Sequence, residues 1–274
     1  AFYYNGCDAE PIGITQTQVF PDPYANFTVP DSACVGAELI IENNSTFQCN
    51  DTVTGALFPS FAVNEPSFSY DFGDCTFYES QLNTNNYNQE DYNDTTHTYN
   101  SPGIYYVQLS AVNFCNENIF EDTVIIFPSP NVSFYANSAV CLYDTTSFTT
   151  NVFASASTTD TLSCGLVIDV PAGDTTFSYQ WSMDEGTDGN YVNGTNTNSP
   201  NPYFVFNSCG DHNVSLTITD GNNCITTFDT IITIWQLPNA LFSAPSVCEG
   251  TRTCINDASS FNTIDTCYGA PITN

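Results

Sequence analysis

Several stretches of this chain recur about every 107 residues, and this period limits the possible folds more than any other feature. The segment PYANF at 23–27 returns as PNVSF at 130–134 and as PNALF at 238–242. A cysteine follows each copy, and these three, Cys34, Cys141 and Cys248, are 107 residues apart. Because independent landmarks share one period, the sequence indicates an array of copies of a single unit.

The residues inside each unit favour strands and turns over helices. Apolar residues alternate with other residues at 106–111, where Val107, Leu109 and Ala111 are separated by Gln108 and Ser110, as in a strand with one buried face. The segment 214–218 repeats this pattern. Thr, Val, Ile, Phe, Tyr, Asn and Gly dominate, and no stretch of a dozen residues has clean helical periodicity. A unit of about 107 residues is the size of an immunoglobulin-like domain. The sequence therefore predicts an all-β fold of tandem immunoglobulin-like β-sandwich repeats.

The repeat landmarks also predict the boundaries. Residues 1–22 are expected to be the last strand or strands of a preceding repeat, and 239–274 the first strands of a third, incomplete repeat. Residues 23–130 and 131–238 are expected to be two complete repeats. The chain is then either a window on a longer array or a subunit whose ends are completed by strands of its neighbours.

The charge balance excludes several classes of partner. Thirty Asp and Glu residues face a single cation, Arg252, which gives a net charge of −29. Nucleic acid and anionic membranes are therefore not expected as electrostatic partners. No apolar run of 18 residues is present, so no membrane insertion is expected.

The same composition argues against an enzyme. A chain without Lys and with one Arg has few groups to stabilise a developing negative charge. The nucleophile-elbow, zinc-protease and phosphate-loop motifs are all absent. The two histidines, His97 and His212, stand in corresponding stretches near Gly103 and Gly210.

Twelve cysteines in 274 residues indicate an oxidising compartment. The shortest gap, from Cys248 to Cys254, does not fit a C-x-x-C zinc site, so disulfides are predicted and no metal is expected at the thiols. The twelve predicted disulfide cysteines are Cys7, Cys34, Cys49, Cys75, Cys115, Cys141, Cys164, Cys209, Cys224, Cys248, Cys254 and Cys267.

The sequence restricts the possible disulfide pairings of these cysteines without selecting one set. Local loop closures are expected in each repeat, and the pairs considered are Cys49 with Cys75, Cys164 with Cys209, and Cys254 with Cys267. Cys7, Cys115 and Cys224 form a second periodic series, with steps of 108 and 109 residues. Between the two series, a bond from Cys34 to Cys224 in the next repeat and a bond from Cys34 to Cys115 in the same repeat both stay open.

Taken together, the landmarks resemble the polycystic-kidney-disease (PKD) repeat, in the cysteine-bearing form of Bacteroidetes-type surface proteins. The first full repeat offers ACVG at 33–36, NNS at 43–45, YDFGD at 70–74, HTY at 97–99 and GIYYVQL at 103–109. The second offers VC at 140–141, YQW at 179–181 and the segment 210–216. It departs from the family at 182–190, and in the first repeat the turn's final glycine is Cys75.

The resemblance implies that His97 is a packing residue. It also implies that the repeats are spacers or binding modules in long extracellular proteins. We therefore expect a secreted or cell-surface structural array, the stalk of a bacterial filament or adhesin, whose partners are further copies or neighbouring repeats. The alternative is a glycan- or calcium-dependent binding module of a larger secreted enzyme or adhesin.

Calcium is the only cofactor that the residues suggest. Asp184, Asp188 and Asn190 lie within one Gly-containing loop and offer hard oxygen ligands at alternating spacing. Asp71 and Asp74 form a second acidic turn. The competing interpretation is that these Asp and Asn side chains only stabilise turns.

The family resemblance also implies O-glycans on triplets of Asp, then Ser or Thr, then an aliphatic residue or Thr. Eight hydroxyl residues stand in such triplets: Ser32, Thr52, Thr95, Thr123, Thr145, Thr161, Thr175 and Thr230. The competing interpretation is that Asp-Thr pairs are ordinary turn and strand-edge chemistry.

If several of these residues carry glycans, the intact mass of the native protein will lie far above the 29.9 kDa of the polypeptide. Mass spectrometry of the native material measures this directly. A mass equal to that of the bare chain would contradict the modification.

Overall fold

The computed structural model describes residues 3–4, 8–9, 22–46, 67–81, 94–112, 116–137, 140–183, 189–238 and 240–259. Every regular element among them is a β-strand, which confirms the all-β prediction. The chain forms two compact units: unit 1 comprises Ala1–Pro128 and Ser155–Gly173, and unit 2 comprises Ser129–Ala154 and Asp174–Asn274.

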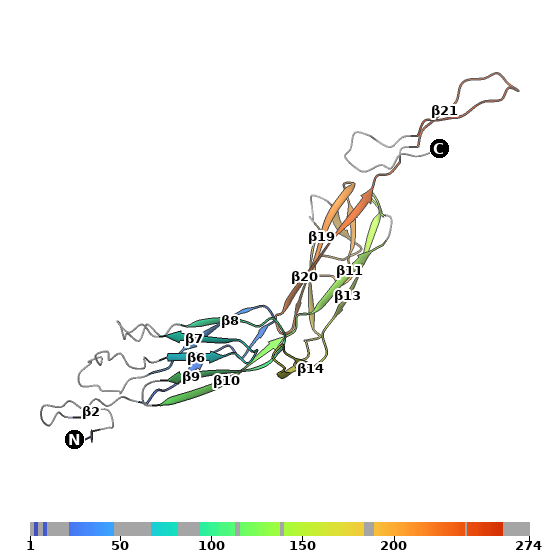
Figure 1. Ribbon diagram of the computed structural model, residues 1–274. Helices are drawn as coiled ribbons and strands as arrows, with labels where there is room; N and C mark the ends of the chain where they lie inside the picture. Colours follow the sequence, from blue (N-terminus) through green and yellow to red (C-terminus); the bar gives the residue numbers. More distant parts are fainter. Residues whose placement is uncertain are drawn as a thin grey trace. The chain divides into compact units, whose positions relative to one another are not determined.

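Unit 1 contains a five-stranded sheet and a three-stranded sheet (Figure 1). The first sheet has the order β4 (Ser32–Cys34), β10 (Glu117–Phe127), β9 (Gly103–Val112), β6 (Ser67–Asp71) and β7 (Phe77–Gln81). The second has the order β3 (Phe27–Thr28), β5 (Glu38–Asn43) and β8 (Thr95–Thr98). Strand β4 pairs with β10 in parallel, and the other pairs are antiparallel.

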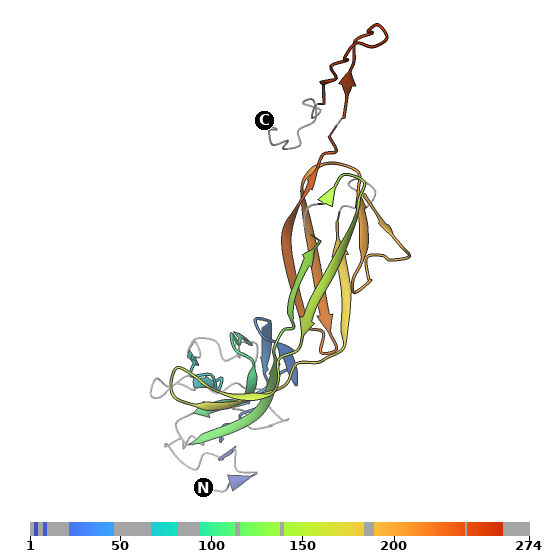
Figure 2. The ribbon, with the colours of Figure 1, turned by 90° about the vertical axis from the view of Figure 1, so that its right-hand side faces the viewer.

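Unit 2 has two four-stranded sheets, whose long strands run in similar directions in Figure 2. One has the order β12 (Val140–Cys141), β20 (Ile225–Trp235), β19 (Gly210–Asp220) and β16 (Phe177–Ser182). The other has the order β11 (Asn131–Ala136), β13 (Thr145–Phe153), β18 (Tyr203–Phe206) and β17 (Gly189–Val192). In order, β11, β13, β18 and β17 correspond to strands A, B, E and D of an immunoglobulin-like sandwich, and β20, β19 and β16 to strands G, F and C, with the short strand β12 added beside strand G. In unit 1, β10, β9 and β6 take the places of strands G, F and C.

Two short pairs lie in the parts of the chain expected to be incomplete repeats. Strand β1 (Tyr3–Tyr4) pairs with β2 (Asp8–Ala9), and β21 (Phe242–Ser243) pairs with β22 (Asn256–Asp257).

The alternating side chains of the long strands build the two cores. In β9, Tyr105, Val107 and Leu109 are buried, and in β19 Val214 and Leu216 are buried. Each fully buried side chain of this size contributes about 1.5–3 kcal/mol relative to an exposed one. The period-2 pattern in the sequence therefore identified the strands that carry both cores.

An indole ring forms the centre of the unit 2 core. Trp181 lies against Phe134 and Phe148, with ring centroids 4.7 Å and 5.2 Å away. Its Nε1–H donates to the carbonyl oxygen of Ser199 at 2.9 Å, so the one polar atom of the buried ring is satisfied. A buried Trp on strand C is the position that immunoglobulin domains use for this purpose.

The connection between strands B and C of unit 2 departs from the expected boundaries. Strands β14 (Thr158–Thr161) and β15 (Val167–Val170) form a hairpin in Ser155–Gly173, a segment that groups with unit 1. The sequence placed these residues in the middle of 131–238 as part of one continuous repeat. Ile168 and Leu162 of the hairpin pack with the core of unit 1, which explains its membership.

Each unit carries a hydrogen bond from the start of strand F to the backbone four residues earlier. In unit 1 the Tyr105 hydroxyl donates to the carbonyl oxygen of Ser101 at 2.9 Å, the contact known as a tyrosine corner. In unit 2 the matching residue is His212, whose Nε2 lies 3.0 Å from the carbonyl oxygen of Ser208. His212 is thus a buried structural residue.

Replacing Tyr105 by Phe should destabilise unit 1 by about 1 kcal/mol, because the Ser101 carbonyl loses its donor while the aromatic packing is kept. Chemical denaturation measures the difference. The neighbouring substitution Tyr106→Phe is the matched control, since Tyr106 is 60% exposed and should change stability little. Equal effects of the two substitutions would contradict this role for Tyr105.

Candidate functional site: a hairpin joined to unit 1 by a disulfide

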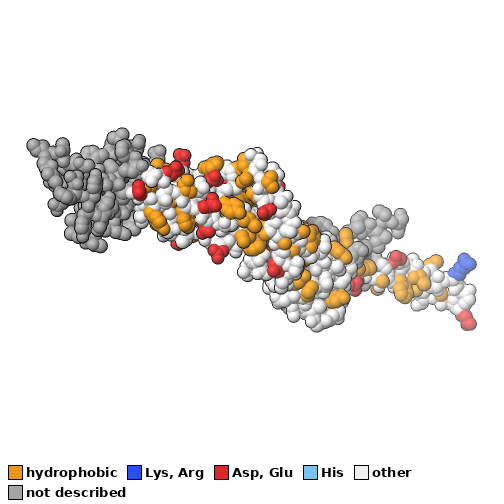
Figure 3. Space-filling view, turned by 90° about the horizontal axis from the view of Figure 1, so that it is seen from below, with side chains coloured by type: hydrophobic (Ala, Val, Ile, Leu, Met, Phe, Trp, Pro, Cys, Tyr) orange, Lys and Arg blue, Asp and Glu red, His pale blue; other side chains and the backbone are white. Residues whose placement is uncertain are grey.

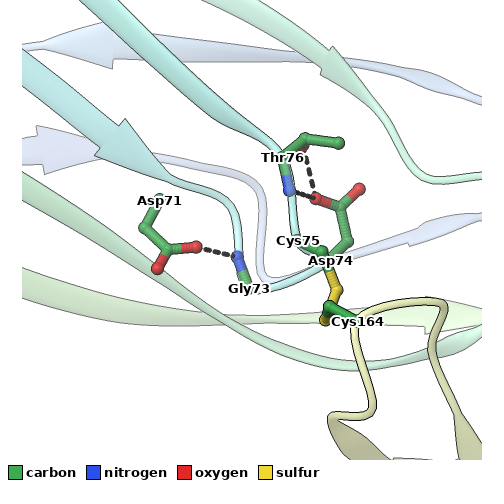
Figure 4. Close-up of a disulfide and its surroundings, with 6 residues drawn as sticks. All are labelled: Asp71, Gly73, Asp74, Cys75, Thr76 and Cys164. Carbon is green, nitrogen blue, oxygen red and sulfur yellow. Dashed lines mark hydrogen bonds between the residues drawn. A yellow bond between two sulfur atoms is a disulfide. The ribbon is translucent and has the colours of Figure 1, made fainter.

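A tight acidic turn follows strand β6 and forms one half of the site. The Asp71 carboxylate accepts the N–H of Gly73 at 2.9 Å, and the Asp74 carboxylate accepts the N–H of Thr76 at 3.1 Å (Figure 4). Asp74 also accepts the Thr76 hydroxyl. Both carboxylates therefore stabilise the turn through local hydrogen bonds, which favours the turn-forming interpretation over calcium ligation here.

Two residues of this turn have a left-handed backbone. Gly73 has φ +73°, and a Cβ there would lie 2.6 Å from the carbonyl oxygen of Tyr106, so only glycine fits. Cys75 has φ +74° although it has a side chain. This is the position at which the PKD-like motif has glycine, and a left-handed backbone costs a non-glycine residue about 1–2 kcal/mol. A cysteine there calls for a compensating interaction.

That interaction is a disulfide to the hairpin. Cys75 is bonded to Cys164, 89 residues later in the chain, with 6.1 Å between the two Cα atoms (Figure 4). Cys164 lies in the turn that joins β14 to β15. The pairings Cys49 with Cys75 and Cys164 with Cys209 are therefore wrong: the bond does not close a loop within one repeat but joins segments from two consecutive repeats.

Apolar contacts seat the hairpin on strand β9. Its residues Ile168 and Val170 are buried, while their neighbours on β15 are exposed. The Cδ1 atom of Ile168 lies where a side chain would begin at Gly103, 2.6 Å from an ideal Cβ. The glycine at the start of β9 thus leaves the space that the hairpin occupies.

A hydrogen-bonded pair and stacked rings lie beside the disulfide. The Nε2 atom of His97 is 2.8 Å from a carboxylate oxygen of Asp74. The His97 ring stacks on Phe72 at 4.0 Å and meets the edge of Tyr99 at 4.5 Å. His97 is therefore a packing residue, as expected, and it also fixes the acidic turn.

These contacts change the titration of two groups. Burial tends to raise the pKa of Asp74, but hydrogen bonds from His97 and Thr76 and the charge of His97 outweigh it and lower that pKa. Burial, followed by the charges of Asp74 and Asp160, raises the pKa of Tyr105 to about 12. Asp160 belongs to the hairpin, so hairpin and turn act on the same tyrosine.

The remaining described cysteines fall into two groups. Cys34, Cys209 and Cys224 are disulfide-bonded. Cys141, Cys248 and Cys254 are free thiols, which differs from the prediction that all twelve cysteines form disulfides. A free Cys254 also contradicts its pairing with Cys267. Cys7, Cys49, Cys115 and Cys267 lie outside the described residues.

The predicted calcium loop is only partly described. Asp184 and Asp188 lie outside the described residues, and Asn190 is an exposed residue of β17 paired with Val205. No group of three or more His, Cys, Asp or Glu side chains suited to a metal occurs within the described ranges. Calcium binding at this loop stays a prediction.

The predicted glycan acceptors differ in accessibility. Ser32, Thr145, Thr161 and Thr175 are exposed, Thr123 and Thr230 are half-buried, Thr95 is buried, and Thr52 lies outside the described residues. At Asp122 and Asp160 the carboxylate accepts the N–H of the following Thr at 2.8 Å, which is ordinary turn chemistry. The exposed four are thus the best candidates for modification.

Figure 3 shows one face of the molecule with its side chains coloured by type. In the face shown in Figure 3, Asp and Glu side chains are scattered among uncharged ones. Over the part of the chain that the structure covers, no helix has the length and apolarity needed to cross a bilayer.

Comparisons with known proteins add little beyond the fold. No family model matches the chain, and no curated protein matches it. Among solved structures, the fibronectin(III)-like modules of Clostridium thermocellum CbhA share 14% identity, cover 77% of this chain and 95% of their own, and give a TM-score of 0.30. An I-band fragment of titin shares 9% identity over 80% of this chain and 69% of its own, with a TM-score of 0.31.

A third similar structure contains three N-terminal domains of the outer capsid protein Hoc of bacteriophage RB49. It shares 9% identity over 90% of this chain and 71% of its own, with a TM-score of 0.28. Identities and scores this low carry no functional argument, and the immunoglobulin-like assignment is visible in the strand order of each unit.

The two cysteines of this site are visible in the sequence, but their pairing is not. Cys75 stands where the PKD-like turn has glycine, and Cys164 is a loop cysteine. The sequence signal for the pairing is a cysteine at a position where the turn favours glycine. The free-energy cost of a left-handed backbone there is offset only by a bond to a residue outside the turn.

The lowered pKa of Asp74 makes unit 1 sensitive to acid. Its contribution to stability is present above the ordinary carboxyl pKa, near 4, and is lost as pH falls through the lower pKa of the folded state. Asp74→Asn should therefore lower stability at pH 7 and flatten the loss of stability below about pH 5. Denaturation curves between pH 2 and pH 7 test this, with His97→Gln as a second variant that should also weaken the acid dependence. Parallel pH profiles for all three proteins would contradict the assignment.

Proposed function

We propose that this chain is a stretch of structural, non-catalytic repeats from the stalk of an extracellular bacterial filament or adhesin. Two immunoglobulin-like sandwiches in tandem and at least one disulfide support a module that works outside the reducing cytosol. The turn at 70–74, in which the Asp71 carboxylate accepts the N–H of Gly73, supports the narrower relationship to PKD repeats.

The observation that carries the proposal is the placement of the hairpin Ser155–Gly173. Its flanking strands β13 and β16 belong to unit 2, while the hairpin belongs to unit 1 and is covalently bonded to Cys75. The backbone therefore passes between the two units three times, at residues 128–129, 154–155 and 173–174. Repeated backbone passages and a covalent bond suit a stalk, which has to withstand tension.

The disulfide also limits how far the chain can be drawn out. Residues between Cys75 and Cys164 lie inside a closed covalent loop, so tension applied at the chain ends bypasses them. Our proposal assigns this loop a mechanical role. Further copies or neighbouring repeats of the same fibre are the proposed partners, and the net charge of −29 favours hydration of the exposed parts.

Single-molecule stretching tests the mechanical role. A loop of 89 residues corresponds to roughly 300 Å of extended chain, at about 3.4 Å per residue. The fully unfolded oxidised protein should therefore be shorter than the reduced protein by at least this amount. Equal contour lengths in the two states would contradict a load-limiting disulfide.

The double variant Cys75→Gly with Cys164→Ser provides the matched control under oxidising conditions. Glycine suits the left-handed backbone at position 75, so the turn itself is preserved. Unit 1 of this variant should unfold at a lower force than the wild type, because the hairpin is then held only by apolar contacts. Unchanged unfolding forces would show that the bond bears no load.

A further inference from the structure

One outer sheet face of unit 2 is uncharged, although the chain has 30 acidic residues. It is formed by the outward residues of the described strands β11, β13, β18 and β17, which alternate with the buried Phe134, Phe148 and Phe204. The side chains on this uncharged face are amides, hydroxyls, two valines and three aromatic rings. Its exposed members include Asn131, Tyr135, Thr149, Asn151, Phe153 and Tyr203.

The other outer sheet faces of the two units all carry exposed carboxylates. In unit 2, Asp229 lies on the outer face of the sheet that contains β20. In unit 1, the five-stranded sheet presents Glu79 and Glu121, and the three-stranded sheet presents Glu38 and Glu42. The uncharged face therefore differs in composition from every other outer face formed by the described strands of the two sandwiches.

Two tyrosines lie on either side of strand β13 on the uncharged face. Tyr135 of β11 pairs with Thr149, and Tyr203 of β18 pairs with Ser147, so the tyrosines are two strands apart and offset by two residues. This places their Cα atoms about 10 Å apart across the sheet and about 7 Å along it. Tyr135 is 64% exposed and Tyr203 is 40% exposed. Two rings at this separation can contact several units of an extended ligand.

The side chains of the uncharged face suit the recognition of sugars. The negative face of an aromatic ring attracts the C–H groups on the flat side of a sugar ring. Between the tyrosines, the Thr149 hydroxyl and the Asn151 amide offer donors and acceptors for sugar hydroxyls. A chain of net charge −29 repels acidic or sulfated polysaccharides, and the face has no cation to bind them. The chemistry therefore favours a neutral sugar polymer.

A second copy of the chain suits this face less well. Two chains that each carry a net charge of −29 repel each other. The only aliphatic side chains among the outward residues of the four strands are Val192 and Val205, and both are half-buried. The face therefore lacks the apolar area that would offset this repulsion.

We propose that the uncharged face of unit 2 binds an extended, neutral β-1,4-linked polysaccharide, whose sugar rings present flat sides to the protein. The rings of Tyr135 and Tyr203 stack against sugar units, and the hydroxyl and amide groups between them bind sugar hydroxyls. The inference adds a ligand to the repeats and does not depend on the filament role.

Sedimentation of the intact chain with insoluble cellulose and with insoluble chitin tests the proposal. The wild-type protein should be depleted from solution by at least one of these neutral polymers, and high salt should not weaken the binding, because the contact is uncharged. Immobilised polygalacturonate, an anionic polysaccharide, should not retain the protein.

Variants locate the site on the sheet. Tyr135→Ala combined with Tyr203→Ala should lower the affinity by about tenfold or more, because both ring contacts are lost. Thr149→Glu should also weaken binding, since it keeps both rings and places a carboxylate between them. The matched control is Tyr106→Ala, which removes a 60% exposed tyrosine from a charged face of unit 1 and should change the affinity by less than about twofold.

Three outcomes would overturn the inference and leave the proposed stalk function intact. The first is a wild-type protein that binds neither cellulose nor chitin. The second is an equal loss of binding in Tyr106→Ala and in the variants of unit 2. The third is a wild-type protein that binds no polysaccharide but forms dimers in analytical ultracentrifugation, while the double tyrosine variant is monomeric, because the face is then an interface between copies of the chain.

Discussion

The structure of unit 1 depends on a covalent bond made at an unfavourable backbone position. Cys75 occupies a left-handed conformation that glycine would adopt without cost, and its bond to Cys164 brings in a hairpin from beyond the end of the unit's own strands. A disulfide that closes a loop of this length stabilises a fold by roughly 4–5 kcal/mol in the chain-entropy model, more than the left-handed residue costs. The cysteine is therefore favourable only with its partner in place.

The apolar half of this junction depends on a missing side chain. Gly103 leaves room for Ile168, so the hairpin reaches the backbone of β9 and becomes part of the core around Tyr105. The bond and the buried isoleucine support each other, because the covalent link keeps the apolar group near its site and the packed group keeps the two sulfurs in reach. Neither contact would fix the hairpin as well alone.

The sequence predicted most of the fold because burial leaves a pattern that neighbouring residues share. Val107 and Leu109 in β9, and Val214 and Leu216 in β19, alternate with exposed residues and so revealed the strands and the common period. The hairpin was not predictable in this way. Its residues Ile168 and Val170 alternate like those of any strand, and alternation does not tell which unit the buried face joins.

The period also identified equivalent positions without predicting their side-chain roles. His97 and His212 were grouped in sequence, yet His97 pairs with Asp74 in a turn, while His212 takes the place of Tyr105 at the start of strand F. The disulfide between Cys75 and Cys164 likewise escaped prediction, because cysteine spacing restricts pairings without selecting one.

The connectivity of the hairpin has a consequence for biosynthesis. Strands β11 and β13 of unit 2 precede the hairpin in the chain, so they leave the ribosome or the export channel before Ile168 and Val170 become available to unit 1. Domains of multidomain proteins usually fold as separate units in order of synthesis. Here the first sandwich is finished only after the second has been started, so maturation of successive repeats must overlap in time.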